Sequence, residues 1–541
     1  MISAQNFLAR LRLSLRIEPA FQGEETPWRL PILIIGLGLV VRLFCFHYTF
    51  IINPDGPLYI HQARAIYYGL GGAPWNSVLG YFSNYPFLIA GTYTIVGDWI
   101  IAAKVVSLLF GTMILLPLYL LSKRLFDEKI ALLVTLVFAL IPFFVDRSVD
   151  VVRGPVFWFF LVLGMHFFVG QIEKTKHLYL LLSSLSFVFA AWARIEGVLF
   201  IGTSYIFMLM VRRERKFVKL AVFSIPIVPL ILIYILRLPV FQLDIDNLFY
   251  LNRIMPDQFA TITDQYQTIR GATSDLFDQA QETIVKRFLL LTRHLVWWIA
   301  IGTLLTGMIK AFFYPFFIVF LMGFKGIWRK LKENGRILYL SILSLSAILL
   351  LSTVVLYFWE IPTRYTGVLV LPSAVFIGFG LERIWTFFRF RFNLKDSLIF
   401  PLICALILAS GLPKVLKPRE ADKAVFKQIG SLIAEKEGND NEILVATSQH
   451  SIRWIAFYAN IGFRGAPCPE KNYDLENIVG SSYEEFIQNL RNRGIRYFLW
   501  EEKHWPRQSA GYLRMGNPAD FVEVGTWSHP DTGKLILFKV I

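Results

Sequence analysis

Eleven apolar stretches, most of them close to the length of a membrane-spanning helix, constrain this chain more than any other feature. A helix needs about 20 apolar residues to cross the hydrocarbon core of a bilayer. The 541 residues are 55% hydrophobic and only 17% charged, which is less charge than a soluble domain of this size carries. We therefore expect an α-helical integral membrane protein. The predicted spans are 30–50, 99–122, 129–146, 154–170, 178–193, 197–211, 218–238, 309–325, 337–358, 365–385 and 397–413.

Lysine and arginine residues are concentrated in the N-terminal segment and in short loops between spans. They comprise Arg10, Arg12, Arg16, Lys123, Arg124, Lys174, Lys176, Arg212, Arg213, Arg215, Lys216, Arg329, Lys330, Lys332, Arg336, Arg389, Arg391 and Lys395. Basic loops favour the cytoplasmic side, and a cytoplasmic N-terminus with eleven spans places all these loops there. The net charge of +15 then reflects topology and contact with anionic lipid of the bilayer, so we expect no nucleic-acid partner.

The opposite side of the membrane is predicted to hold the first outer loop, residues 51–98, and the tail. Residues 57–68 of the loop suit a short helix, and residues 85–96 are apolar but too short to span. Residues 285–306 mix basic side chains with tryptophans, a pattern typical of the membrane interface. The short spans 178–193 and 197–211 are predicted to meet as half-spans.

The composition becomes polar after Pro413, and helix and strand patterns alternate from there on. We predict helices at 426–436 and 483–492, and strands at 442–447, 497–500, 521–527 and 534–541. The predicted organisation is thus a transmembrane domain, 1–413, followed by an extracytoplasmic α/β domain, 414–541.

Asp55 lies in the motif Asn53-Pro54-Asp55-Gly56-Pro57, directly after the first apolar stretch. A charge is costly beside a bilayer and is by default a functional hypothesis. A carboxylate here could act as a general base on a membrane-linked substrate. It could equally cap the following helix, a common role for Asp before Pro.

Two further charged motifs occur near the outer ends of predicted spans. Asp150 and Arg153 are three residues apart and share one face if that segment is helical. Arg194 and Glu196 lie between two short apolar stretches, where charges face protein or a water-filled cavity. Each pair could contact substrate, but a structural ion pair is the simpler reading of each motif.

Lys310 and Arg364 begin predicted spans on the outer side. Both could bind a phosphate, or they could extend to the interface and contact ordinary lipid. His61 has no companion at metal-ligand spacing, and Arg64 follows it on the same helix. We therefore predict no metal-binding residue and no certain cofactor, although a divalent metal stays an open alternative.

These motifs together resemble the GT-C class of membrane glycosyltransferases, in particular the branch with protein O-mannosyltransferases and aminoarabinose transferases. That branch has an acidic motif in its first outer loop followed by Tyr; Asp55 and Tyr59 match, whereas Gly56 replaces a second acid. The other matching motifs, in order, are Asp150 to Phe160, Ala193-Arg194-Ile195-Glu196-Gly197, Lys310 with Tyr314, and Arg364-Tyr365 before Leu371-Pro372.

The resemblance implies an enzyme that transfers a sugar from a polyprenyl-phosphate donor with inversion, on the outer face of a bacterial plasma membrane. The acceptor would be an envelope protein, glycolipid or polysaccharide. Asp55 would be the general base, and Arg364, Lys310 and either Arg153 or Arg194 would hold the phosphate. The other residues expected to contact substrate are Tyr59, Arg64, Asp150, Glu196 and Tyr365.

Two other classes of protein fit parts of the same pattern. A transporter or flippase of lipid-linked sugars also needs many spans and buried charges, but such proteins commonly contain internal repeats, and this sequence shows none. A non-catalytic assembly protein would tolerate replacement of Asp55 and Arg364.

Overall fold

The computed structural model describes residues 28–70, 83–174, 176–211, 215–229, 232, 258–418, 420–448, 451–465, 475, 478–505 and 520–541. The predicted basic residues Arg10, Arg12, Arg16, Arg212 and Arg213, and much of the predicted span 218–238, lie outside these residues.

The chain divides into two units. The first, called here the helical unit, comprises residues 1–43, 108–148 and 153–416. The second, called here the mixed unit, comprises residues 44–107, 149–152 and 417–541. The sequence predicts one boundary after residue 413, whereas in the structure the tail forms a unit with the first outer loop and a short segment around Asp150.

Two helices, α2 (Arg29–His47) and α5 (Trp99–Met113), belong partly to each unit. The other helices of the helical unit are α6 (Leu115–Lys123), α7 (Glu128–Leu140), α8 (Pro142–Ser148), α9 (Gly154–Lys174), α10 (His177–Ala193), α11 (Gly197–Met210), α12 (Lys216–Ser224), α16 (Gln258–Gln279), α17 (Thr283–Phe312), α18 (Tyr314–Met322), α19 (Ile327–Glu333), α20 (Gly335–Phe358), α21 (Thr363–Val370), α22 (Ala374–Arg391) and α23 (Asp396–Val415).

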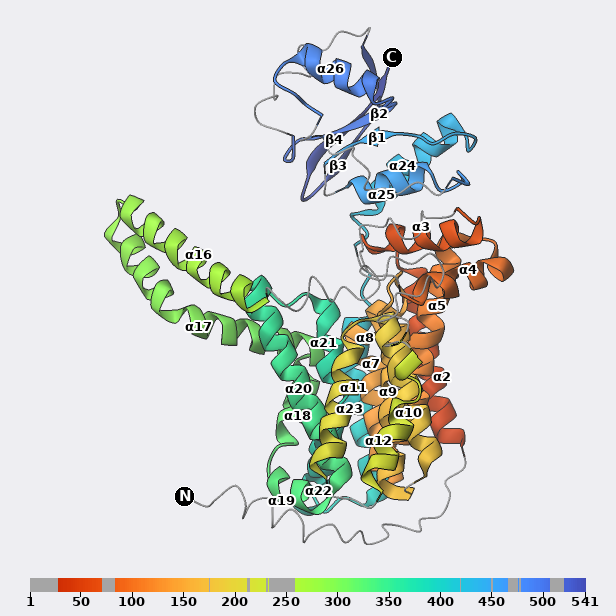
Figure 1. Cartoon of the computed structure of the whole chain (residues 1–541), viewed down its shortest axis with the longest axis vertical. Helices are drawn as coiled ribbons and strands as arrows, with labels where there is room; N and C mark the ends of the chain where they lie inside the picture. Colours follow the sequence, from red (N-terminus) through yellow and green to blue (C-terminus); the bar gives the residue numbers. More distant parts are fainter. Residues whose placement is uncertain are drawn as a thin grey trace. The chain divides into compact units, whose positions relative to one another are not determined.

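Helix α7 forms the centre of the helical unit (Figure 1). Every residue from Ile130 to Leu140 is buried, and the helix packs against α6, α22 and α23. A helix that is apolar on all sides is stable only when its neighbours cover the whole circumference. Asp127 begins α7 by accepting a hydrogen bond from the Ile130 N–H.

Six helices among the described residues are long and apolar enough to cross a membrane, and up to eight if each bent pair counts as one span. The prediction of a mostly helical integral membrane protein is confirmed, but its count of eleven spans is not. One bend, of 59°, separates α7 from α8. Ile141 at this bend is extended because the residue before a proline, here Pro142, avoids the helical region.

The predicted span 309–325 is wrong. Residue Phe313 has a φ of +69°, which is uncommon for a residue other than glycine. Helix α17 therefore ends at Phe312, and the short helix α18 follows with Pro315 in its first turn. Helix α17, which begins at Thr283, is itself the candidate span in this region.

Helices α16 and α17 lie side by side and extend away from the rest of the helical unit (Figure 1). Tyr266 and Trp297 stack between them, with ring centroids 5.3 Å apart. Large apolar side chains such as Phe288 and Trp298 are about two-thirds exposed. The interfacial location predicted for residues 285–306 stays a prediction.

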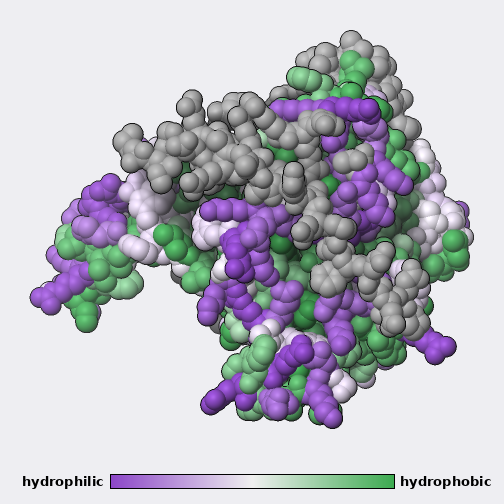
Figure 2. All heavy atoms as spheres, turned by 90° about the horizontal axis from the view of Figure 1, so that it is seen from below, coloured by the Kyte–Doolittle hydropathy of each residue, from purple (hydrophilic) through white to green (hydrophobic). Residues whose placement is uncertain are grey.

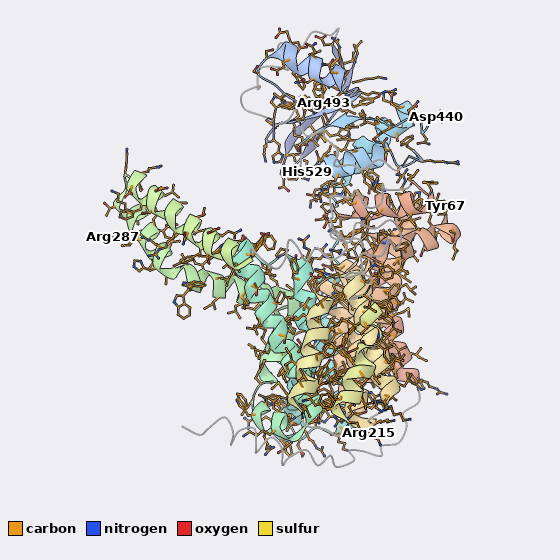
Figure 3. All side chains as sticks on the ribbon, in the orientation of Figure 1. Tyr67, Arg215, Arg287, Asp440, Arg493 and His529 are labelled. Carbon is orange, nitrogen blue, oxygen red and sulfur yellow. The ribbon has the colours of Figure 1, made fainter. Side chains whose placement is uncertain are left out.

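One end of the helical unit gathers the predicted basic loops. Glu173 at the end of α9 forms ion pairs with Arg124, which follows α6, and with Arg336, which begins α20. Lys330 of α19 lies 3.1 Å from Glu382 of α22. Figure 2, which views this end, shows hydrophilic side chains gathered over it, and Arg215 lies there too (Figure 3). Loops far apart in sequence thus share one end, as the basic pattern predicts.

The mixed unit combines short helices with one four-stranded sheet. Its helices are α3 (Gly56–Tyr67), α4 (Tyr85–Val96), α24 (Ala424–Glu437), α25 (Ile452–Ala459) and α26 (Tyr483–Asn492), and its strands are β1 (Val445–Ala446), β2 (Tyr497–Glu501), β3 (Phe521–His529) and β4 (Gly533–Val540). The strand order is β1-β2-β4-β3. Strands β1 and β2 are parallel, and the other pairs are antiparallel.

An aromatic cluster forms the core between α26 and the sheet. Phe498 of β2 contacts Phe486 of α26, Phe538 of β4 and Phe521 of β3, with ring centroids 4.9 to 5.5 Å apart. Residues next to them in the strands, such as Leu499 of β2 and Leu537 of β4, are also buried, so both faces of the sheet are covered at its centre. Each predicted strand overlaps an observed one, but β1 covers only two residues of the predicted strand 442–447, and helix α25 is missing from the sequence prediction.

Candidate functional site

Asp55 lies at the junction between the first span and helix α3. It is the N-cap residue of α3 by position, but within the described part of the chain its side chain makes no capping hydrogen bond. Arg453 of α25 instead donates from Nη1 to Asp55 Oδ1 at 2.8 Å. The two side chains are 30% and 31% exposed. The helix-capping alternative is thus not observed, and the carboxylate remains accessible from solvent.

Asp150 anchors the loop that carries Asp55. Its Oδ1 accepts hydrogen bonds from the Asn53 N–H at 2.8 Å and from the Val151 N–H at 2.7 Å. The Asn53 side chain in turn accepts from the Asp55 N–H at 3.0 Å. Residues 149–153 are not helical, so the condition under which Asp150 and Arg153 would share a helical face is not met. Asp150 thus holds the backbone of the loop that carries Asp55.

Tyr59 and Arg64, both expected to contact substrate, are buried in the mixed unit. The Tyr59 ring packs edge-on against Tyr85 at 5.4 Å. Arg64 donates to the backbone carbonyls of Asn460 and Phe463. Burial lowers the pKa of Arg64 to about 10, so the side chain stays charged at neutral pH. Arg64 joins the first outer loop to the tail.

Helix α25 brings Arg453 to Asp55, a contact that the sequence prediction missed. The neighbouring Trp454 fixes the position of this helix. Trp454, which is 2% exposed, donates from Nε1 to the Ile52 carbonyl at 2.8 Å. Its ring stacks on Phe426 of α24, with centroids 5.6 Å apart. These contacts of Trp454 fix the position of helix α25, and therefore of the backbone of the preceding residue, Arg453. The only local signal for it is the apolar periodicity of residues 452–459.

A second missed cation, Lys104 of α5, lies in the same unit. Its Nζ donates to the Phe46 carbonyl at 3.1 Å and lies 4.1 Å from the centre of the Phe46 ring. It is 6% exposed and interacts electrostatically with Asp150 and with Lys427 of α24. A buried lysine beside Asp150 partly neutralises the carboxylate that anchors the Asp55 loop.

A second cluster lies in the helical unit, between α10 and α11. Arg194 and Glu196 form a bidentate ion pair, with distances of 3.2 Å and 2.5 Å, and their side chains are 5% and 7% exposed. The positive charges of both Arg194 and Arg153 act on the Glu196 carboxylate. The structure thus joins Arg153 to this cluster, whereas the sequence prediction paired it with Asp150.

Tyr365 connects the buried cluster to Arg364. The Arg194 guanidinium lies 5.4 Å from the centre of the Tyr365 ring, and that of Arg364 lies 5.2 Å from it. Arg364 is exposed, as is Lys310 in the last turn of α17. Nearby, Arg147 of α8 donates to the Thr363 hydroxyl at 3.0 Å. The exposed cations are the ones that an anionic ligand can reach.

Among the described residues, one group could hold a metal ion, and Asp55 is not part of it. The group is Asp422, His529 and Asp531, near the end of β3 (Figure 3). The His529 Nδ1 accepts from the Thr532 N–H at 3.4 Å, so the neutral ring carries its proton on Nε2. That Nε2 lies 3.3 Å from Asp422 Oδ2. The buried Nε2 has no hydrogen-bond partner among the described residues, so this group stays a candidate metal site.

A family model matches part of the sequence of this chain. Residues 84–240 match the family described as dolichyl-phosphate-mannose-protein mannosyltransferase. No curated protein sequence matches the chain.

Two solved structures illustrate the shared fold. ArnT from Cupriavidus metallidurans bound to undecaprenyl phosphate has a TM-score of 0.59 and 12% identity, covering 95% of this chain and 99% of that chain. The oligosaccharyltransferase AglB from Archaeoglobus fulgidus, in complex with an inhibitory peptide and a dolichol-phosphate, has a TM-score of 0.54 and 11% identity, covering 94% and 74%. The predicted resemblance to the GT-C class is confirmed, and at identities this low the likeness to the two structures shows the fold alone.

Proposed function

We propose that this membrane chain of the GT-C fold transfers a sugar from a polyprenyl-phosphate donor to an acceptor of the cell envelope, with inversion at the anomeric carbon. Two similar structures hold a polyprenyl or dolichyl phosphate, and the matching family is described by a dolichyl-phosphate sugar donor. These findings support a lipid phosphate as the carrier of the sugar. The acceptor is a protein, a glycolipid or a polysaccharide.

The observation that carries this proposal is the position of the Asp55 carboxylate. It follows directly after the first span, it is 30% exposed, and its loop is held by hydrogen bonds to Asn53 and Asp150. A carboxylate at the membrane boundary can meet a lipid-linked donor and a water-soluble acceptor. Such positioning before the reaction is what a general base requires.

The proposed step is a single displacement. Asp55 takes the proton from an acceptor hydroxyl, whose oxygen forms a bond to the anomeric carbon. The bond between that carbon and the phosphate oxygen breaks, and its electron pair stays on the phosphate. Negative charge grows on the leaving phosphate, so nearby cations lower the barrier.

We assign the leaving phosphate to exposed cations of the helical unit, Arg364 and Lys310. Arginine in particular suits a phosphate because its planar group donates two parallel hydrogen bonds. Arg194 has its guanidinium committed to Glu196 in a buried pair, and Arg153 interacts with the same carboxylate. These two residues and Tyr365 then position Arg364, which is a narrower role than the substrate contact predicted for them.

The proposed orientation follows from the basic end of the helical unit. Positively charged loops favour the cytoplasmic side, and the ion pairs of Arg124, Arg336 and Lys330 lie at one end. This orientation places the N-terminus in the cytoplasm and the tail, residues 414–541, outside a bacterial plasma membrane. The reaction then takes place on the outer face.

The test uses the purified protein in liposomes with a panel of polyprenyl-phosphate sugars, with membrane extract as the source of acceptor. We expect release of free polyprenyl phosphate from at least one donor, together with transfer of its sugar. A parallel reaction with a chelator decides whether a divalent metal takes part. No release from any donor, with or without extract, would refute the proposal and favour a flippase or an assembly protein.

A further inference from the structure

We propose that Arg453 alternates between two anionic partners, the Asp55 carboxylate before the donor binds and the donor phosphate once it is bound. This inference rests on the proposed role of Asp55 as the general base. It assigns the tail a part in the reaction: Arg453 holds the base in an inactive pair, and arrival of the lipid phosphate releases it.

The first argument is the exposure of the pair. Arg453 Nη1 and Asp55 Oδ1 are 2.8 Å apart, which is a well-formed charge-assisted hydrogen bond. Yet each side chain is about one-third exposed, and ion pairs that reach water contribute little net stability. Exchange of the carboxylate for another anion therefore costs little.

The second argument is that the helix carrying Arg453 is fixed while its side-chain tip is not buried. Trp454, the next residue, is 2% exposed and bonded to the Ile52 carbonyl. The end of α25 is held by Arg64, which donates to the Asn460 carbonyl at 3.2 Å. A rigid backbone with a long, partly exposed side chain allows the guanidinium to change partners without any movement of the tail.

The third argument is the charge around α25. Lys423 lies over the Trp454 ring at 5.8 Å, and Lys427 lies over the Tyr458 ring at 5.9 Å. Lys427 also interacts electrostatically with the buried Lys104. Lys423 is itself paired with Glu420 at 2.7 Å, so Arg453, Lys427 and Lys104 are the cations that can attract a further anion. The donor phosphate carries one charge while it is joined to both lipid and sugar, and a second charge develops on it as the bond to the sugar breaks, which strengthens its attraction to Arg453.

The exchange couples donor binding to the chemical step. While Asp55 accepts a hydrogen bond from Arg453, its oxygen is a weaker base for an acceptor hydroxyl. When Arg453 turns to the phosphate, Asp55 takes the hydroxyl proton as the sugar moves to the hydroxyl oxygen. The electron pair of the broken bond stays on the phosphate that Arg453 holds. After the lipid phosphate departs, Asp55 passes its proton to water and Arg453 returns.

The experiment measures binding of undecaprenyl phosphate to the full-length protein in liposomes, without sugar transfer. Four forms are compared: wild type, Asp55→Asn, Arg453→Ala and the double variant. We expect Arg453→Ala to weaken binding by about ten- to a hundredfold, as for loss of a hydrogen bond between charged groups. Asp55→Asn should tighten binding, because the competing partner of Arg453 is gone.

The double variant gives the decisive result. If Asp55 acts by competing for Arg453, the gain from Asp55→Asn disappears when Arg453 is already alanine, and the two effects are not additive. Simple removal of a nearby negative charge would give the same gain in both backgrounds. An unchanged gain, or unchanged binding by Arg453→Ala, would overturn the inference.

Two further variants separate phosphate binding from a structural role. Arg453→Lys keeps the charge without the planar fork, so its affinity should lie between those of wild type and Arg453→Ala. Arg491→Ala is the matched control, because Arg491 pairs with Asp520 at 3.0 Å elsewhere in the tail, and it should leave affinity unchanged. If the lysine variant binds no better than the alanine variant and both unfold at lower temperature, Arg453 is structural and the inference fails.

Release of polyprenyl phosphate from the sugar donors by the wild type is measured in the same liposomes. Release that occurs alongside additive binding effects would refute the partner exchange and leave the proposed function intact. Absence of release from every donor would refute the proposed function itself, whatever the binding results.

Discussion

Asp55 and Glu196 are both carboxylates paired with an arginine, but their surroundings differ. The Asp55 pair is about one-third exposed, and its two partners are 398 residues apart. The Glu196 pair is at most 7% exposed, and its partners are two residues apart. A buried pair must stay closed because an unpaired charge there is very costly, whereas an exposed pair can open. The difference in burial therefore separates a structural role from a chemical one.

The largest effect on stability is expected when the buried pair is broken. Glu196→Gln leaves the Arg194 charge buried without its counter-ion, which should lower the free energy of unfolding by about 3–5 kcal/mol. The measurement is the thermal unfolding midpoint of the purified protein. The matched control is Glu333→Gln, which breaks an exposed pair with Arg329 and should change stability by less than about 0.5 kcal/mol.

The Glu196→Gln variant can also refute the contrast between a structural role for Glu196 and a chemical role for Asp55. If Glu196→Gln unfolds at the wild-type temperature but loses release of the lipid phosphate, Glu196 takes part in the chemistry. The contrast between the two carboxylates would then be wrong.

A smaller effect is expected when the Asp55 loop loses its anchor. Asp150→Ala removes the acceptor of the Asn53 and Val151 N–H groups, an effect of roughly 1–3 kcal/mol. We expect about a tenfold or greater loss in the rate of release, because the base is then less well placed. Asp150→Asn retains an oxygen acceptor and should recover most of the rate. Equal impairment of the two variants would show that the charge of Asp150, rather than its hydrogen bonds, is required.

The smallest effect expected is the pH dependence that Glu437 gives to the free energy of unfolding. Hydrogen bonds from Lys539, Tyr497 and Arg496 lower the pKa of Glu437 to about 2. A lowered folded-state pKa gives stability that is present above the ordinary value of about 4.5 and is lost as pH falls toward 2. Lys539 and Arg496 are about half exposed, so water screens these pairs and the effect should be about 1 kcal/mol or less.

The pH effect is measured as the difference in unfolding midpoint between wild type and Glu437→Gln. We expect wild type to be more stable at pH 6 and the difference to shrink at pH 3. A difference that is the same at both values would show that Glu437 acts through packing rather than charge.

Much of the local structure could be predicted from the sequence. Helix α4 has the predicted limits of 85–96, and α10 ends at Ala193 before the predicted break at Arg194. Such elements depend on the periodicity and length of apolar segments, which are local properties. The basic loops were likewise predicted to share one end, because charge distribution determines topology.

The candidate site was predicted only in part, for a physical reason. Asp55 stands out because a charge beside an apolar stretch is costly. Its partner Arg453 is one of many arginines and lies on a helix that the sequence prediction omitted. The two residues are 398 positions apart, and no local sequence pattern links them. The sequence pairs Asp150 with the nearby Arg153, whereas in the structure its carboxylate accepts hydrogen bonds from Val151 and from Asn53, which is 97 residues away. Contacts between distant segments carry no periodicity that a single sequence could reveal.

The most direct test of the central claim is the single-turnover rate of lipid phosphate release by wild type and Asp55→Asn, at saturating donor. The variant keeps the size of the side chain but removes its capacity to accept a proton. We predict at least about a hundredfold loss of rate, with donor binding at least as tight as in wild type and the unfolding midpoint unchanged. Release at the wild-type rate would contradict the assignment of Asp55 as the base.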